Sequence, residues 1–389
     1  MLKTDYSHCT GCEACAQKCP QQCVSMVPGE FGFLYPKIDM EQCVDCHLCE
    51  MVCPIDKDMR LPVNQQAYAA VYRDLKVIKR STSGGAFSAI AEAVLNVNGI
   101  VYGVAMDKFI VHHVRIQDRS ELETLRGSKY VQSRIGTVFK AVENDLNAKR
   151  KVLFSGTPCQ VDGLRRYLCK EYEDLITIDI ICHGVGSQAY FNQFVASLTR
   201  KWPTAKEIRF RSKRFSGWSC SSGSVVVTDK RCENKEKAFY SYENYYYQYF
   251  LQGDIYRKSC YSCKYANTNR QGDITLGDFW GVEKLKLPIN TYNGCSLVVV
   301  NTVKGHSLIR EIDNLEKVSV PLKDAARGNG QLIMPSKLRE ERSRRVAEYE
   351  ELSGEEIAVK YQKCEKKAIA FGQIKKLIPY PLKLFLRRF

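Results

Sequence analysis

A doubled cysteine motif near the start of the sequence constrains this chain more than any other feature. Each copy has the spacing Cys-x2-Cys-x2-Cys-x3-Cys-Pro, and the copies span residues 9–20 and 43–54. Two-residue spacing lets a tight loop direct three thiolates at one cubane, while the fourth cysteine, next to proline, ligates the other cluster. The motif therefore predicts two [4Fe–4S] clusters. The expected ligands are Cys9, Cys12, Cys15 and Cys53 for the first cluster, and Cys43, Cys46, Cys49 and Cys19 for the second.

A pair of zinc sites is the alternative interpretation, because Cys-x2-Cys also occurs in zinc proteins. Zinc sites seldom need a third cysteine two residues further on, and the terminal Cys-Pro has no role in them. The spacing therefore favours iron–sulfur chemistry. Cys23 lies outside the repeated pattern, and we expect it to be a structural thiol.

The 18 cysteines of this 389-residue chain also bear on its compartment. The sequence contains no run of 18 apolar residues, and the motif that begins at Cys9 stands where the apolar segment of a signal peptide would lie. We therefore expect a cytoplasmic protein. Thiols in that reducing compartment are more often metal ligands or catalytic groups than disulfides.

Charge is unevenly distributed along the chain, whose formal net charge is +15. Residues 1–63 carry 5 basic and 9 acidic side chains, residues 200–270 carry 15 and 6, and residues 363–389 carry 8 and 1. Nucleic acid is a common partner of basic chains, but the sequence has no helix-turn-helix, no histidine-paired zinc finger and no aromatic RNA-binding motif. We expect no nucleic-acid partner. Anionic cofactors, or contact of the basic tail with the cytoplasmic face of a membrane, account for the charge equally well.

Beyond residue 62 the sequence alternates between helical and strand-like patterns. Helical periodicity occurs over residues 86–97, 137–148 and 188–201. Apolar, strand-like segments occur at residues 100–106, 109–116, 151–155, 175–181, 208–211, 224–228, 274–276 and 296–301. This alternation predicts a mixed α/β or α+β core behind a small metal-stapled module. From about Lys337 the chain is charged and loosely helical, without a recognisable motif.

Four further cysteines lie in turns or at strand ends. Cys159 follows a strand and a Gly-Thr-Pro turn, Cys182 ends the apolar segment 176–181, and Cys260 and Cys263 form a Cys-x2-Cys in a basic, tyrosine-rich loop. Such positions often carry functional groups, so a third cluster is one interpretation. Buried structural thiols are the other, and spacing alone leaves both open. The remaining cysteines are expected to be structural: Cys169, Cys220, Cys232, Cys295 and Cys364.

Several glycine- and hydroxyl-rich turns could cradle a phosphate. The segment 81–85, Ser-Thr-Ser-Gly-Gly, precedes a predicted helix, whose free N–H groups and positive end favour an anion. Serine caps and glycine turns also begin many ordinary helices. The sequence has no Rossmann fingerprint and no P-loop, so a bound nucleotide would be held by a less familiar fold.

Six motifs in order resemble one known family, the beta subunit of coenzyme F420 hydrogenase/dehydrogenase, here fused to an N-terminal dicluster ferredoxin module. They are residues 81–85, 125–133, 154–160, 182–185, 259–263 and 273–281, and the resemblance covers roughly residues 65–310. It implies a small ferredoxin module, residues 1–62, followed by a mixed-sheet domain. Within that domain, residues 63–150 would form a flavin-binding region and residues 151–336 would contribute flavin and third-cluster contacts. Residues 337–389 form a basic tail.

The resemblance also implies cofactors and site residues. Cys159, Cys182, Cys260 and Cys263 would ligate a third [4Fe–4S] cluster, and FAD would contact Thr82, Ser83, Gly84, Gly85, Lys129, Tyr130, Ser133, Ser155, Gly156 and Thr157. Lys129 and His183 are the candidate catalytic residues. Lys129 would stabilise an anionic reduced flavin, and His183 or His113 would transfer a proton, with a structural role in the core as the alternative for each histidine. Gly186 and Gln188 replace prolines of many relatives, which leaves the substrate open.

The predicted function is that of an iron–sulfur flavoprotein oxidoreductase. Clusters carry one electron at a time whereas FAD accepts one or two, so FAD would connect the clusters to a two-electron carrier or substrate. The expected partner is a redox protein or a soluble two-electron carrier. Two alternatives remain: a non-catalytic ferredoxin-type relay, which would lack flavin absorbance, and a basic nucleic-acid-binding iron–sulfur protein, which would bind DNA in a salt-dependent way.

Overall fold

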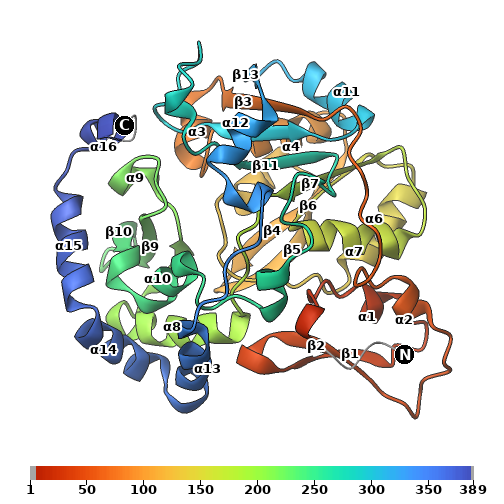
Figure 1. Ribbon diagram of the computed structural model, residues 1–389, viewed down its shortest axis with the longest axis horizontal. Coiled ribbons are helices and arrows are strands. Elements are labelled where there is room, and N and C mark those ends of the chain that lie inside the picture. Colours follow the sequence, from red (N-terminus) through yellow and green to blue (C-terminus); the bar gives the residue numbers. More distant parts are fainter. Residues whose placement is uncertain (1–5, 387–389) are drawn as a thin grey trace.

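The N-terminal module lies at one corner of the protein, as a computed structural model that describes residues 6–386 shows (Figure 1). Its hairpin pairs β1 (Val24–Pro28) with β2 (Leu34–Ile38) in antiparallel register, and two short helices, α1 (Ala14–Lys18) and α2 (Leu48–Met51), carry the third cysteine of each motif. The helices touch each other, and α1 also packs on α7 (Pro158–Leu168) of the next domain. The two motifs therefore fold back on one another.

A mixed eight-stranded sheet forms the centre of the large lobe, which consists of this sheet and the helices that cover it. Its strand order is β13-β3-β12-β11-β7-β6-β4-β5. The middle strands β4, β6, β7 and β11 are parallel neighbours, while β12, β3, β13 and β5 add antiparallel strands at the two edges. The strand bounds are β3 (Gln66–Tyr72), β4 (Ile100–Asp107), β5 (Ile110–Ile116), β6 (Val152–Gly156), β7 (Leu175–Ile180), β11 (Ile274–Asp278), β12 (Ser296–Val300) and β13 (Leu315–Val320).

Helices cover both faces of this sheet because its central strands are apolar on both sides. Along β4 and β6, Val101 and Leu153 join the core with α4 (Ala86–Leu95), whereas Tyr102 and Phe154 join the core with α6 (Val138–Asn147) and α7. Successive strand residues point to opposite faces, so one strand serves two cores. The other helices of this lobe are α3 (Leu75–Arg80), α5 (Leu122–Leu125), α11 (Val303–Glu311) and α12 (Leu322–Arg327).

The small lobe is built on a three-stranded antiparallel sheet and an aromatic core. Its sheet has the order β10-β9-β8, with β8 (Ala205–Arg209), β9 (Ser222–Thr228) and β10 (Asn234–Tyr240). Helices α8 (Gln188–Lys201), α9 (Lys213–Ser216) and α10 (Tyr245–Gln252) complete it. The ring of Tyr246 lies 5.7 Å from Tyr190 and 5.5 Å from Phe194, so aromatic packing supplies much of the buried apolar surface.

Residues 337–389, predicted as a loosely helical tail, form helices that run along the small lobe at the left of Figure 1: α13 (Glu341–Glu351), α14 (Gly354–Cys364), α15 (Lys366–Lys376) and α16 (Tyr380–Leu386). Gly372 of α15 packs on the ring of Tyr242, and Tyr380 donates a hydrogen bond to the Tyr292 carbonyl at 3.1 Å. The outer face of α15 leaves Phe371 and Ile374 exposed. In the described residues, no helix has the length and apolarity needed to cross a membrane.

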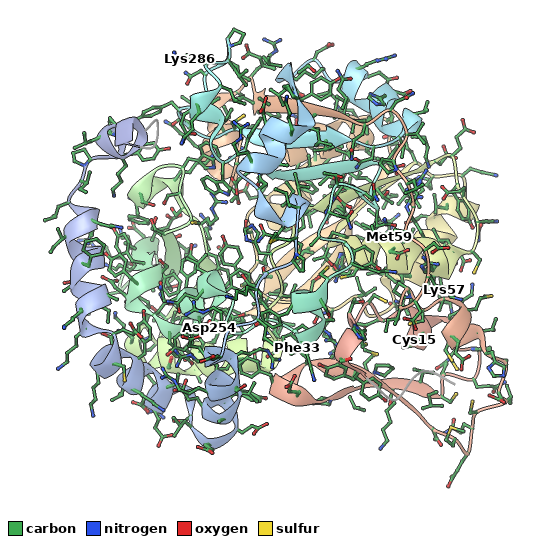
Figure 2. All side chains as sticks on the ribbon, in the orientation of Figure 1. Cys15, Phe33, Lys57, Met59, Asp254 and Lys286 are labelled. Atoms are coloured by element: carbon green, nitrogen blue, oxygen red, sulfur yellow. The ribbon has the colours of Figure 1, made fainter. Side chains whose placement is uncertain are left out.

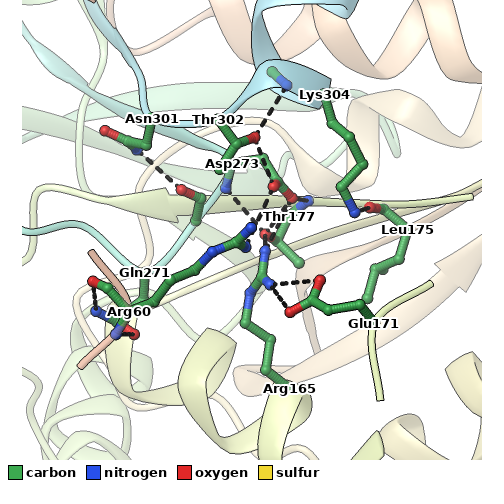
Figure 3. Close-up of polar contacts among 12 residues, drawn as sticks. Arg60, Arg165, Glu171, Leu175, Thr177, Gln271, Asp273, Asn301, Thr302 and Lys304 are labelled. Carbon is green, nitrogen blue, oxygen red and sulfur yellow. Dashed lines mark hydrogen bonds and ion pairs between the residues drawn. The ribbon is translucent and has the colours of Figure 1, made fainter. Parts of the chain in front are cut away.

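A buried carboxylate joins the sheet to the helices that cover it (Figure 3). Asp273, just before β11, accepts hydrogen bonds from the Thr177 backbone N–H at 2.8 Å and hydroxyl at 2.7 Å, from Arg165 of α7 at 3.2 Å, and from Thr302 at 2.8 Å. Arg60, which follows the N-terminal module, pairs with the same carboxylate at 3.6 Å. Asp273 thus fixes where β7 and β11 lie relative to α7, the region that carries the site described next.

The predicted fold class, a ferredoxin module followed by a mixed-sheet domain, is confirmed. Strands from residues 63–150 and from residues 151–336 alternate within one sheet, so these two regions share a single core.

Candidate functional site

The first cysteine site lies within the N-terminal module, at the side that faces α7. Cys9, Cys12, Cys15 and Cys53 line one cavity of about 210 Å³. Figure 2 labels Cys15, which comes from α1. Burial raises the pKa of the Cys12, Cys15 and Cys53 thiols, and neighbouring thiolates raise it further. The structure therefore brings together the set predicted for the first cluster.

The second cysteine site lies farther from the large lobe. Cys19, Cys43, Cys46 and Cys49 line a smaller cavity, which is the set predicted for the second cluster. Cys46 is exposed to solvent. Cys23, predicted to be structural, is buried and also lines this cavity, with its Sγ 3.3 Å from that of Cys19. Sequence spacing gave no sign of this fifth thiol, because β1 brings it back beside Cys19.

The third cysteine site is formed by three separate segments. Cys159 lies in the first turn of α7, Cys182 follows β7, and Cys260 and Cys263 come from the loop around residues 258–262. All four line one cavity together with Thr10 of the module. Burial raises the pKa of Cys159 to about 11 and that of Cys260 to about 12. Four thiols that line one cavity fit the donor set of a [4Fe–4S] cluster.

The first and third cysteine sites adjoin each other. A Cβ built on Gly163 of α7 would lie only 2.9 Å from the Cβ of Cys12, so glycine is needed for the module to pack this closely on α7. Thr10, next to Cys9 in sequence, lines the third site. No three His, Cys, Asp or Glu side chains of residues 6–386 converge as ligands of a single metal ion. A cluster distributes its thiolates over several irons instead.

The main cavity, of about 520 Å³, opens where the parallel strands β6, β7 and β11 end. Ser155, Ile181 and Asp278, at or just beyond the carboxyl ends of these strands, line it. Open α/β sheets commonly bind ligands at this edge, and the volume lies in the usual range for cofactor sites. Nine of the ten predicted flavin contacts line the cavity: Thr82, Ser83, Gly85, Lys129, Tyr130, Ser133, Ser155, Gly156 and Thr157.

Gly84 is the predicted flavin contact that does not line the main cavity. A Cβ at this position would lie 2.3 Å from the Ala70 carbonyl oxygen and 2.5 Å from the Ser296 nitrogen. The glycine therefore permits the turn to pack on β3 and β12. The N–H groups of Gly84 and Ala86 donate to the Ser296 hydroxyl at 3.0 and 3.3 Å, so these two amides of the predicted phosphate cradle already have an acceptor.

The candidate catalytic residue Lys129 has extensive internal contacts. Its Nζ donates to the carbonyls of Thr124, Leu125 and Arg126 at 3.3, 3.0 and 2.8 Å, at the carboxyl end of α5. Burial lowers the pKa of Lys129 to about 7, while the three carbonyls favour its charged form. The ammonium thus orders the turn that carries Gly127 and Ser128 along the cavity wall.

The two histidines considered for proton transfer lie in different places. His183 lines both the main cavity and the third cysteine site, and burial lowers its pKa. His113 lies on β5, stacked on Phe154 at 5.2 Å, with its Nε2 3.1 Å from the Ser155 carbonyl oxygen, and burial lowers its pKa to about 4. His113 is not among the residues that line the main cavity.

Sequence analysis missed a polar cluster that the small lobe contributes to the cavity. Arg211, with 5% of its side chain exposed, forms an ion pair with Asp278, whose other oxygen accepts a hydrogen bond from the Trp218 indole at 2.8 Å. The Nη2 of Arg211 is buried without a hydrogen-bond partner in the described structure. Arg211 was only one of 15 basic residues in a charged stretch, although Asp278 and Trp280 belong to a motif already recognised.

One segment separates the main cavity from the third cysteine site. Residues 182–185 line both cavities, as does Thr157. Thr157 caps α7, and its hydroxyl lies 3.1 Å from the Cys159 Sγ. Gln160 completes this cap and donates to the carbonyl and hydroxyl of Ser133 at 3.1 Å, which holds the opposite wall in place. The two cavities are thus adjacent and share a wall of a few residues.

Comparisons with known proteins agree with this division of the chain. Residues 8–57 match a 4Fe–4S dicluster domain, and residues 149–324 match the family described as the C terminus of the coenzyme F420 hydrogenase/dehydrogenase beta subunit. An uncharacterised polyferredoxin-like protein of Methanocaldococcus jannaschii is 38% identical over 55 residues, which cover 12% of this chain and 33% of that protein. The match thus spans about a third of the relative.

Among solved structures, a chain of the F420-reducing [NiFe] hydrogenase complex from Methanosarcina barkeri has a TM-score of 0.45 and 14% sequence identity, covering 75% of this chain and 91% of that chain. The family matches identify iron–sulfur clusters and an oxidoreductase family, and they confirm the resemblance inferred from the motifs. From residue 149 to residue 324 the chain belongs to the coenzyme F420 hydrogenase/dehydrogenase beta subunit family, and its N-terminal part is a 4Fe–4S dicluster domain.

Proposed function

We propose that this protein passes electrons between three [4Fe–4S] clusters and a two-electron carrier or substrate through FAD. The observation that carries the proposal is the order of the sites. The second cysteine site is partly exposed, the first packs on α7, the third shares Thr10 with the module, and the main cavity shares Cys182 and His183 with the third site. A chain of adjacent sites from solvent to an interior cavity suits stepwise electron transfer.

In this proposal the three cysteine sets hold the clusters by their thiolates, and the flavin occupies the main cavity. A bound flavin supplies the exchange between one-electron and two-electron steps. Lys129 keeps the turn at residues 127–128 in place, and Gln160 orients Ser133 on the opposite wall. Arg211 offers an unpaired N–H group toward the cavity for an acceptor on the flavin or the substrate.

His183 is the proposed proton-transfer residue. It lines the main cavity where this adjoins the third cysteine site, so a proton held on its imidazole lies beside the path of the electrons. Its lowered pKa keeps the ring largely neutral near pH 7, which suits a group that accepts a proton and returns it. Lys129 is the weaker candidate because its ammonium already donates to three carbonyls.

Anaerobic purification followed by iron, sulfide and flavin analysis tests this proposal. We expect about twelve irons, on the basis of three four-iron clusters, and one flavin per chain. Ser155→Leu should lower the flavin content because a larger side chain would project from the cavity wall. Ser197→Leu is the matched control, since Ser197 is half-buried on α8 and does not line the cavity.

Each outcome distinguishes between functions. Protein that contains iron but shows no flavin absorbance after incubation with FAD would be a ferredoxin-type relay. Equal flavin content in the two serine variants would mean that the flavin binds elsewhere than in the main cavity.

A further inference from the structure

A single arginine connects the N-terminal module to the loop of the third cysteine site. Arg257 is 1% exposed. Its guanidinium donates to the Cys9 carbonyl at 2.6 Å, to the Cys9 Sγ at 3.6 Å, to the Leu34 carbonyl at 2.8 Å and to the Gln132 side chain at 3.1 Å. Its backbone N–H donates to Val185, and its carbonyl accepts from the Cys260 N–H at 2.9 Å. Arg257 therefore contacts the surroundings of two cysteine sites at once.

The surrounding residues are arranged to admit this guanidinium. Gly11 has φ of +64°, and a Cβ there would lie 2.7 Å from the Nη1 of Arg257, so a side chain would be strained and would also collide. The guanidinium stacks over Tyr35 at 4.2 Å, and Phe33, labelled in Figure 2, lies 5.3 Å away. These rings exclude water from the charge and keep it aimed at Cys9.

Arg257 has no carboxylate partner in the part of the chain that the structure describes. Glu13 is the acidic side chain whose pKa reflects the charge of Arg257, but its two oxygens accept the Ile135 and Gly136 N–H groups at 3.0 and 2.9 Å. A buried charge without a counter-charge is strongly unfavourable. The thiolates of an assembled cluster at Cys9 would provide that counter-charge, and Cys159 and Cys260 also lie within its electrostatic influence.

The second cysteine site has the opposite electrostatic surroundings. No Lys or Arg lines its cavity among the described residues, whereas Asp45 and Glu50 do. Cys46 is exposed there, so water also screens any charge. Positive charge and N–H donation to ligand sulfurs stabilise the reduced form of a cluster, because reduction adds negative charge; acidic neighbours destabilise it.

We propose that Arg257 raises the reduction potential of the first-site cluster above that of the second-site cluster. This inference rests on the proposed presence of both clusters. An electron that arrives at the exposed second site then moves inward, oxidising the second-site cluster and reducing the first-site cluster. Arg257 is a tuning residue and touches neither flavin nor substrate.

The test is a redox titration of the full-length protein, reconstituted anaerobically, followed by the electron paramagnetic resonance of the reduced clusters. Arg257→Gln removes the charge and should shift the higher-potential wave to a more negative potential, with the lower wave unchanged. Arg342→Gln is the matched control: Arg342 is similarly buried and also holds the module, through Glu30 at 2.9 Å, but reaches no cysteine. Cys46→Ser alters the second-site cluster and so identifies which wave belongs to it.

An unchanged higher wave in Arg257→Gln would overturn the proposal, as would an equal shift in Arg342→Gln or assignment of the higher wave to the second site. If Arg257→Gln does not retain about eight module irons, Arg257→Lys replaces it. Lysine keeps the charge but loses the fork, so a smaller shift in the same direction is expected and no shift contradicts the proposal. Flavin content does not enter this measurement, so failure here is distinct from failure of the flavin assignment.

Discussion

Replacing Asp273 by asparagine tests how the sheet edge that carries the site is held together. Asp273 is fully buried, and its two oxygens accept hydrogen bonds from Thr177, Arg165 and Thr302. Burial would raise the pKa of Asp273, but the positive charges of Arg165 and Lys304 and the Thr177 hydrogen bonds hold it below its ordinary value. The carboxylate is therefore charged at neutral pH, and asparagine of the same shape removes that charge.

The magnitude follows from what asparagine can still do. Its single carbonyl oxygen can accept from Thr177, while the Thr302 hydroxyl can rotate to accept from the new amide. The lost interaction is the charge-assisted contact with Arg165, which is 10% exposed and also pairs with the exposed Glu171. Breaking a buried pair costs about 3–5 kcal/mol. Because Glu171 partly compensates Arg165, we expect the lower end, about 3 kcal/mol of the free energy of unfolding.

Anaerobic urea unfolding, followed by tryptophan fluorescence at pH 7, measures this loss as a lower transition midpoint. Asp107→Asn, at the exposed end of β4, is the matched control and should leave the free energy of unfolding within about 0.5 kcal/mol of the wild-type value. Both proteins must retain the same iron content before the comparison. If Asp273→Asn behaves like Asp107→Asn, the network in Figure 3 does not hold the strands in place, and the reasoning fails.

Three further predictions concern other parts of the chain. The double variant Cys260→Ser and Cys263→Ser should hold about eight irons instead of about twelve, with Cys232→Ser unchanged, and a wild-type protein that never exceeds eight irons would contradict a third cluster. Because burial lowers the pKa of Lys129 to about 7, the unfolded chain binds more protons than the folded chain between pH 7 and about 10, so stability should rise over that range; in Lys129→Met the rise in urea midpoint should disappear, and its persistence would refute the assignment. The full chain should co-sediment with anionic vesicles more strongly than a chain without residues 366–389, whose helix α15 leaves apolar and basic side chains exposed; equal binding would exclude membrane contact by the tail.

Local spacing predicted the cysteine sites better than any other part of the structure. The repeated motif specifies which thiols face one another because a tight loop fixes three of each set, and the structure groups them accordingly. The third site could not be derived in this way. Cys159, Cys182 and Cys260 meet only because β6 and β7 end at one edge of a sheet, and strand order is a long-range property.

Other misses also have physical causes. Helix α7 begins with proline and contains Gly163, which weakens its helical pattern, yet that glycine is what allows Cys12 to pack against it. Strands β3 and β13 were not predicted, although their pairing with each other and with β12 builds one edge of the sheet. Arg257 and Arg211 were hidden in a basic stretch that a solvated surface would explain equally well. Their roles depend on burial, which sequence composition does not report.

The buried contacts between the module and the large lobe have a kinetic consequence. A separate ferredoxin must find its acceptor by diffusion, and the rate of that encounter depends on protein concentration and ionic strength. Here Arg257 reaches Cys9, Lys264 donates to the Pro54 carbonyl at 2.5 Å, and Arg342 pairs with Glu30, so the donor is already docked on its acceptor. Transfer from the module inward should therefore be first order and nearly independent of dilution and salt, leaving only delivery of electrons to the exposed end of the module subject to collision.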